Sequence, residues 1–175
     1  VMAQTEIDKF STSERLNKQD LDVISVTLTT DAETIADNKV FAQAIEIPFA
    51  TSENGGSALI KSITILDQTT TGPAMDIVFS SVNTSISGDE GKAVGEDVAD
   101  LDAAFVNMLG VVKIVAGDYT DLFDSKLGSK TGIDLGIHSA AASTSIFASA
   151  INRSGANFTA GATTVLRMKV TIQKD

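Results

Sequence analysis

The sequence predicts an all-β fold, an antiparallel β-sandwich of jelly-roll-like form with one short helix and an extended N-terminal arm. About eight or nine short segments are rich in valine, isoleucine and threonine, and turn residues separate them. Within these segments apolar residues alternate with polar ones, which is the period of a strand with one buried face. A length of 175 residues is typical of a single domain with its own core.

The chain divides into an arm, residues 1–20, and a sandwich domain, residues 21–175. The arm mixes charges of both signs and has few apolar residues, so it cannot close a core by itself. Two interpretations stay open: a frayed terminus, or an arm that becomes ordered against a partner. In the second, Phe10 and Leu16 are the apolar anchors, and Arg15 and Lys18 complete the partner-binding set.

Two strands are expected at the start of the domain. Residues 21–30, LDVISVTLTT, alternate Ile24, Val26 and Leu28 with more polar neighbours and are rich in β-branched side chains. Residues 40–49 predict the second strand, which Pro48 should end or place at an edge. Its candidates for burial are Ala44, Ile45 and Ile47.

Residues 58–80 form the centre of the predicted sandwich, as two alternating runs joined by the polar stretch 67–73. We expect neighbouring antiparallel strands, linked by a loop longer than a tight hairpin turn. The apolar faces of these two runs carry Leu59, Ile63, Ile65, Met75, Ile77 and Phe79, and Ser80 lies on the polar face.

The second half of the chain begins with a polar segment, residues 81–96, which predicts an exposed loop. Residues 97–109 predict the helix, because Val98, Leu101, Phe105 and Met108 recur at helical spacing before Gly110. Strands are then expected at residues 111–115, 119–123, 132–138, 143–151 and 163–173. In the last of these, Arg167 and Lys169 are expected on the face opposite the apolar residues Met168, Val170 and Ile172.

Composition disfavours several classes of partner. The net charge of −10 repels phosphate backbones and anionic membranes, so no nucleic acid is expected. No apolar run approaches the roughly 20 residues that span a bilayer, so no membrane is expected either. The absence of cysteine excludes disulfides and thiolate metal sites.

No group of residues predicts an enzyme, and we expect no catalytic residue, cofactor or metal. His138 is the single histidine; Asp134 lies on the same face of its strand but four positions away, about 13 Å along the strand, and no nucleophile elbow occurs. The acidic residues Asp89, Glu90, Glu96, Asp97, Asp100 and Asp102 lack the spacing of a calcium loop. A solvated loop and helix start account for them, and a weak cation site is the alternative.

The ordered set of segments resembles a family of small structural proteins without cysteine, encoded near the head genes of tailed bacteriophages. The likeness runs from Val26 to Ile172. Its most telling parts are Thr27-Leu28-Thr29, Ile35-Ala36, the strand end 63–67, the junction 109–112 and the strand 144–148. These are packing and turn patterns, not catalytic motifs.

The resemblance implies a virion protein of the decoration or cement type, bound to the major capsid protein on the capsid surface. We also expect a homo-oligomer, with a trimer favoured, because an oligomer binds many identical shell sites with avidity. The longer arm of residues 2–20 departs from the family, whose members begin near the first strand. The rival function is a carbohydrate-binding or host-adhesion module of a phage fibre, which an exposed Trp or Tyr platform would favour; the chain has no Trp.

Overall fold

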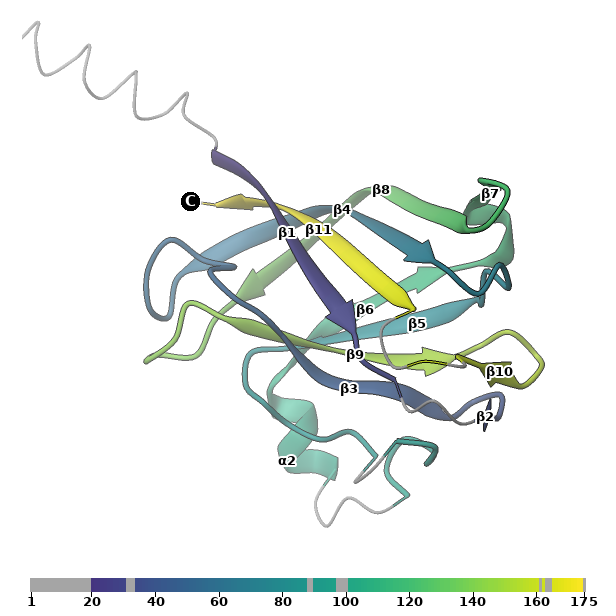
Figure 1. Ribbon diagram of the computed structural model, residues 1–175. Coiled ribbons are helices and arrows are strands. Elements are labelled where there is room, and N and C mark those ends of the chain that lie inside the picture. The colour runs from purple at the N-terminus through teal and green to yellow at the C-terminus, as the bar shows by residue number, and fades with distance from the viewer. Residues whose placement is uncertain are drawn as a thin grey trace, which may run out of the picture.

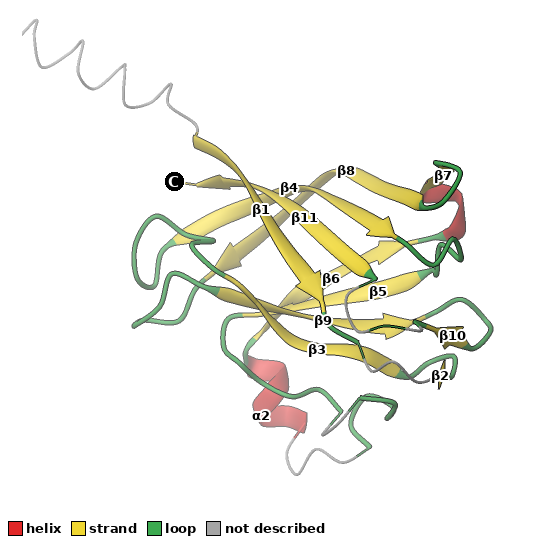
Figure 2. Ribbon diagram, viewed as in Figure 1, coloured by secondary structure: helices red, strands yellow, loops and turns green. Residues whose placement is uncertain are grey.

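The structure of the protein, a computed structural model, describes residues 20–30, 34–87, 90–96, 101–160, 162 and 165–174. Its strands form two stacked antiparallel sheets and one small strand pair (Figures 1 and 2). The predicted β-sandwich is therefore confirmed. Among the described helices, none is long and apolar enough to span a membrane.

The first sheet has five strands in the order β1-β11-β4-β8-β7 and the second has four in the order β3-β9-β5-β6. The first comprises β1 (Asp20–Leu28), β4 (Ser57–Asp67), β7 (Tyr119–Asp121), β8 (Lys126–His138) and β11 (Leu166–Lys174). The second comprises β3 (Val40–Ile47), β5 (Met75–Ser80), β6 (Met108–Ile114) and β9 (Ile146–Asn152). The remaining elements are β2 (Thr34–Ile35), β10 (Phe158–Thr159), α2 (Leu101–Val106) and the 3-10 turn η1 (Ala116–Asp118).

The connectivity is that of a jelly roll. When the short strands β2, β7 and β10 are left out, eight strands remain. Numbered 1 to 8 along the chain, they lie in the order 1-8-3-6 in the first sheet and 2-7-4-5 in the second. In the first sheet the first and last of these strands lie side by side, as purple β1 and yellow β11 show in Figure 1, and in the second sheet the second and seventh do. This arrangement of two Greek keys is the double-sheet jelly roll.

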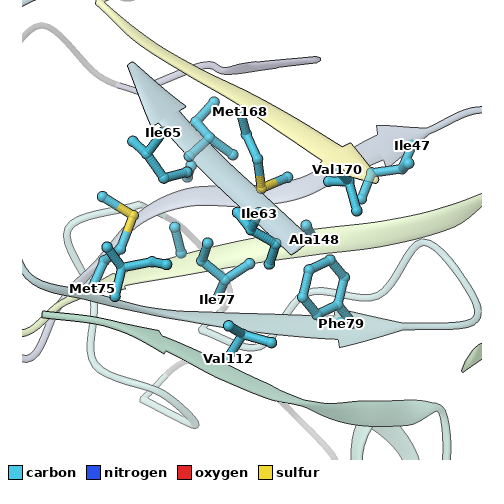
Figure 3. Close-up of a cluster of buried hydrophobic side chains, with 14 of the residues drawn as sticks. Ile47, Ile63, Ile65, Met75, Ile77, Phe79, Val112, Ala148, Met168 and Val170 are labelled. Atoms are coloured by element: carbon cyan, nitrogen blue, oxygen red, sulfur yellow. The ribbon is translucent and has the colours of Figure 1, made fainter. Parts of the chain in front are cut away.

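The core lies between the sheets and confirms most of the expected apolar faces. Ile63 and Ile65 of β4 and Ile77 and Phe79 of β5 are fully buried, and Figure 3 shows them converging with Met168 of β11. The prediction that β4 and β5 are neighbours is wrong, however. β4 pairs with β11 and β8, and β5 pairs with β9 and β6.

The loop between β4 and β5 crosses from one sheet to the other, and Asp67 holds it in shape. The buried carboxylate of Asp67 accepts hydrogen bonds from the backbone N–H and hydroxyl of Thr69, both 2.7 Å, and from the N–H of Gly72, 2.6 Å. The two strands consequently face each other across the core. Alternation predicted their buried faces correctly, because a strand with one buried face shows the same alternation whether the two strands are neighbours in one sheet or lie in facing sheets.

A bulge in β4 changes the expected face of Leu59. Ile60 and Ser62 of β4 pair with the consecutive residues Ile172 and Thr171 of β11, so one extra residue, Lys61, enters β4 there. Ile60 is therefore fully buried, whereas Leu59 is only half-buried. In β3 similar shifts leave Ala44 and Ile45 half-buried, and only Ile47 of the three candidates is fully enclosed.

The segment after β5, predicted as an exposed loop, instead packs over the outer face of the four-stranded sheet. Ile86 is buried there against Val40, Val78 and Ile151 on the outer face of the four-stranded sheet. Ser80, expected on a solvated face, is buried for the same reason.

The helix is shorter than predicted, since α2 has only six residues and Met108 already belongs to β6. Val98 lies outside the described residues. Phe105, expected on the packed face of the helix, is 70% exposed, and Ala104 is the buried residue of the described part of α2.

Candidate interaction surfaces

The predicted partner-binding residues Phe10, Arg15, Leu16 and Lys18 lie outside the described residues. The described chain begins with β1, which forms one edge of the five-stranded sheet. Leu21 and Val23, at the start of this edge strand, are 60% and 62% exposed. The surface next to the predicted arm is therefore an open edge that carries two apolar side chains.

The histidine and its nearest carboxylate do not form a catalytic pair. His138 is exposed at the end of β8, in register with Ser57. Asp134 lies on the same strand, but its carboxylate accepts from Lys61 of β4. Four positions along β8 separate the two residues, and the extended strand holds them apart.

The described part of the acidic segment forms ion pairs within the chain. Glu96 accepts from the ammonium of Lys39 and from the N–H of Ala93, both at 2.8 Å, and lies 3.7 Å from Lys92. The Lys39 hydrogen bond, followed by that from Ala93, lowers the pKa of Glu96 from 4.5 to about 2. In the part of the chain that the structure describes, no group of acidic or histidine side chains could hold a metal ion; Asp89, Asp97 and Asp100 lie outside it.

The buried polar groups at one end of the sandwich serve the fold. Tyr119 packs against the core, and its hydroxyl donates to the carbonyl of Pro73 at 3.0 Å. Burial raises the pKa of Tyr119 above its ordinary value of 10, and the charges of Asp67 and Asp118 add to that effect. These contacts fasten the β4–β5 loop to β7.

The outer face of the five-stranded sheet carries a concavity of about 650 Å³. One row of cross-strand partners runs through it from Thr27 to Arg167, Leu66 and Leu127. The next row contains Ser25, Lys169, Thr64 and Ser129. We call this surface the groove; its floor is the leucine pair, and Arg167 and Lys169 stand beside each other at one side.

The two cations of the groove differ from most others in this acidic chain. Seven other basic residues among those described form ion pairs with carboxylates of the chain: Lys39, Lys61, Lys92, Lys126, Lys130, Arg153 and Lys174. Arg167 and Lys169 have no carboxylate partner among the described residues, and neither does Lys113 on the other sheet. Within the described part of the chain, the groove is thus a local site of positive charge without a pairing carboxylate.

Next to the groove, the β7–β8 hairpin ends in an apolar tip. The N–H of Leu122 donates to the carbonyl of Ser125 at 2.8 Å, which closes the turn. At this tip Phe123 is 96% exposed and has a φ of +71°. The left-handed conformation is rare for a bulky aromatic residue. Asp124 follows it, exposed and without an ion pair to any residue described.

Alternation along the last strand correctly placed Arg167 and Lys169 opposite the buried face of β11. It could not show that Leu66 and Leu127 lie beside them, because that proximity depends on strand order. Phe123 was assigned to a strand, but β7 ends at Asp121. The adjacent pair Leu122-Phe123 between two aspartates was the available signal of a turn.

Comparisons with known proteins show little similarity. No protein-family model matches the chain, and no curated protein matches it. One similar solved structure is the X-ray structure of Tomato Aspermy Virus, with 6% sequence identity and a TM-score of 0.32. The alignment covers 98% of this chain and 95% of the other. A TM-score this low does not establish a shared fold.

Proposed function

We propose that this protein is a structural virion component that binds and stabilises the shell of the major capsid protein, as a decoration or cement protein of a tailed bacteriophage. The observation that carries the proposal is the open edge of β1, with exposed Leu21 and Val23 directly after the predicted arm. The jelly-roll topology supports it, because viral capsid and lectin domains use this architecture. The sequence resemblance favours the capsid role.

An edge strand has free backbone donors and acceptors that a neighbouring chain can pair with. A shell subunit that adds a strand to β1 would also cover Leu21 and Val23. Burying a large apolar side chain completely contributes about 1.5–3 kcal/mol, so two half-exposed residues give a modest contact. Repetition of that contact over a lattice of identical subunits makes it strong through avidity.

Sugar binding on a phage fibre is the second candidate, since lectins also use jelly rolls. Stacking on sugars commonly uses Trp or Tyr. This chain has no Trp, and its single tyrosine, Tyr119, packs against the core with its hydroxyl bonded to Pro73. The capsid role therefore fits these residues better.

The test is co-sedimentation of purified protein with shells that lack it. We expect binding by the full chain and at least tenfold weaker binding by the double variant Leu21→Ser, Val23→Ser. Val111→Ser removes an exposed apolar side chain from β6 of the other sheet and should bind as the full chain does. Absence of shell binding, together with retention of the full chain on host-envelope polysaccharide, would support the adhesion module instead.

A further inference from the structure

The apolar hairpin tip and the groove are complementary in polarity and charge. The tip offers the ring of Phe123, flanked by Leu122 and by the carboxylate of Asp124, which forms no ion pair with any described residue. The groove offers the apolar pair Leu66 and Leu127 beside two cations that likewise have no ion pair within the described part of the chain. We propose that the hairpin tip of one copy of this protein inserts into the groove of a second copy, and that this contact builds the homo-oligomer.

Each part of the tip has a counterpart in the groove. Phe123 would cover the leucine floor and remove its ring from water. A guanidinium next to an aromatic ring adds a favourable cation–π contact, which Arg167 is placed to make. The carboxylate of Asp124 would compensate the charge of Arg167 and Lys169, which no carboxylate among the described residues pairs.

The conformation of Phe123 also indicates a role outside the monomer. An aromatic residue that is 96% exposed gains nothing from the core, and at a φ of +71° it occupies a strained backbone region. Such strain persists where a side chain has to be held in a particular direction. The turn projects Phe123 outward at the end of the five-stranded sheet, where Figure 1 shows the β7 hairpin.

A second copy of the chain is the occupant that these observations favour. A chain of net charge −10 repels its own copies unless local positive charge meets local negative charge at the contact. The positive groove of one copy and the negative Asp124 at the tip of another provide that pairing of opposite charges. Because the two surfaces differ, the contact is heterologous, and copies joined in this way form a closed ring when the rotation between them closes.

The proposal does not depend on shell binding, and mixing two variants tests it. Phe123→Ser removes the tip and keeps the groove. Arg167→Glu with Lys169→Glu removes the charge of the groove and keeps the tip. We expect each variant alone to sediment as a monomer, and an equimolar mixture to form a heterodimer, because one intact tip and one intact groove remain. The wild-type chain should associate, less strongly as salt is raised.

Two substitutions serve as controls on the same protein. Phe105→Ser removes another exposed phenylalanine, on α2, and Lys113→Glu reverses another cation without an ion pair, on β6. Both should associate like the wild type, and circular dichroism should show all variants folded. A wild-type chain that stays monomeric over the whole concentration range would overturn the proposal. So would variants that associate unchanged, or a mixture that remains monomeric.

Discussion

Phe79 of β5 and Ile63 of β4 reach the same core from opposite sheets, and both are fully buried. Truncation of Phe79 to alanine leaves a cavity that the packed strands cannot close, so we expect Phe79→Ala to lower the free energy of unfolding by about 3–5 kcal/mol. Ile63→Val removes one methylene and should cost about 1 kcal/mol. Urea denaturation measures both values; small and equal losses would contradict this account of the core.

Glu96 predicts a pH dependence of stability in the acid range. Its pKa in the folded protein, about 2, lies below the ordinary 4.5, so the ionised form stabilises the fold. That contribution is fully present above about pH 4.5 and is lost as the pH falls towards about 2. The stability difference between wild type and Glu96→Gln, followed by thermal melting at low salt, should shrink over this interval.

Salt provides the control for that prediction. Glu96 and its partners Lys39 and Lys92 are solvent-accessible, so mobile ions screen their attraction. At high salt the difference between wild type and Glu96→Gln should be smaller at neutral pH. A difference that stays constant with pH would show that the ion pairs do not affect stability.

At the scale of the elements, the contact between β7 and β8 depends on a glycine. A Cβ atom at Gly128 would lie 2.9 Å from Cε1 of Tyr119, the cross-strand partner of Gly128. Tyr119 cannot easily move because its hydroxyl is bonded to Pro73. We expect Gly128→Ala to destabilise the protein by about 1–3 kcal/mol through overpacking.

Gly136 in the same strand is the matched control. A Cβ atom there would have no neighbour within 4 Å, so Gly136→Ala should change stability little. Chemical denaturation of the two variants side by side makes the comparison. Equal losses would mean that β8 resists any added side chain and that the Tyr119 contact is not the cause.

At the scale of the whole molecule, the arm and the sandwich can be separated by truncation. A variant that begins at Leu21 removes Phe10 and Leu16 and leaves the β1 edge in place. We expect it to fold, because the described core residues all lie from β1 onwards, and to bind shells more weakly than the full chain. Co-sedimentation compares the two chains, and undiminished binding would assign docking to the sandwich alone.

The sequence by itself determined the fold class and most buried faces. Alternation is a local property, and it correctly identified Ile63, Ile65, Ile77 and Phe79 as core residues and Arg167 and Lys169 as outward-facing. Pro48 likewise ended its strand as expected, since β3 stops at Ile47. These predictions succeeded because backbone geometry alone relates successive side chains.

The tertiary structure decided which strands are partners and which surfaces meet. Asp67 and its loop send β5 into the second sheet, and a bulge in β4 opposite β11 buries Ile60 in place of Leu59. The groove exists because β11 and β8 both pair with β4, which brings Arg167 and Leu127 to the two sides of Leu66. Pairing between distant segments depends on contacts across the whole core, and no local pattern encodes it.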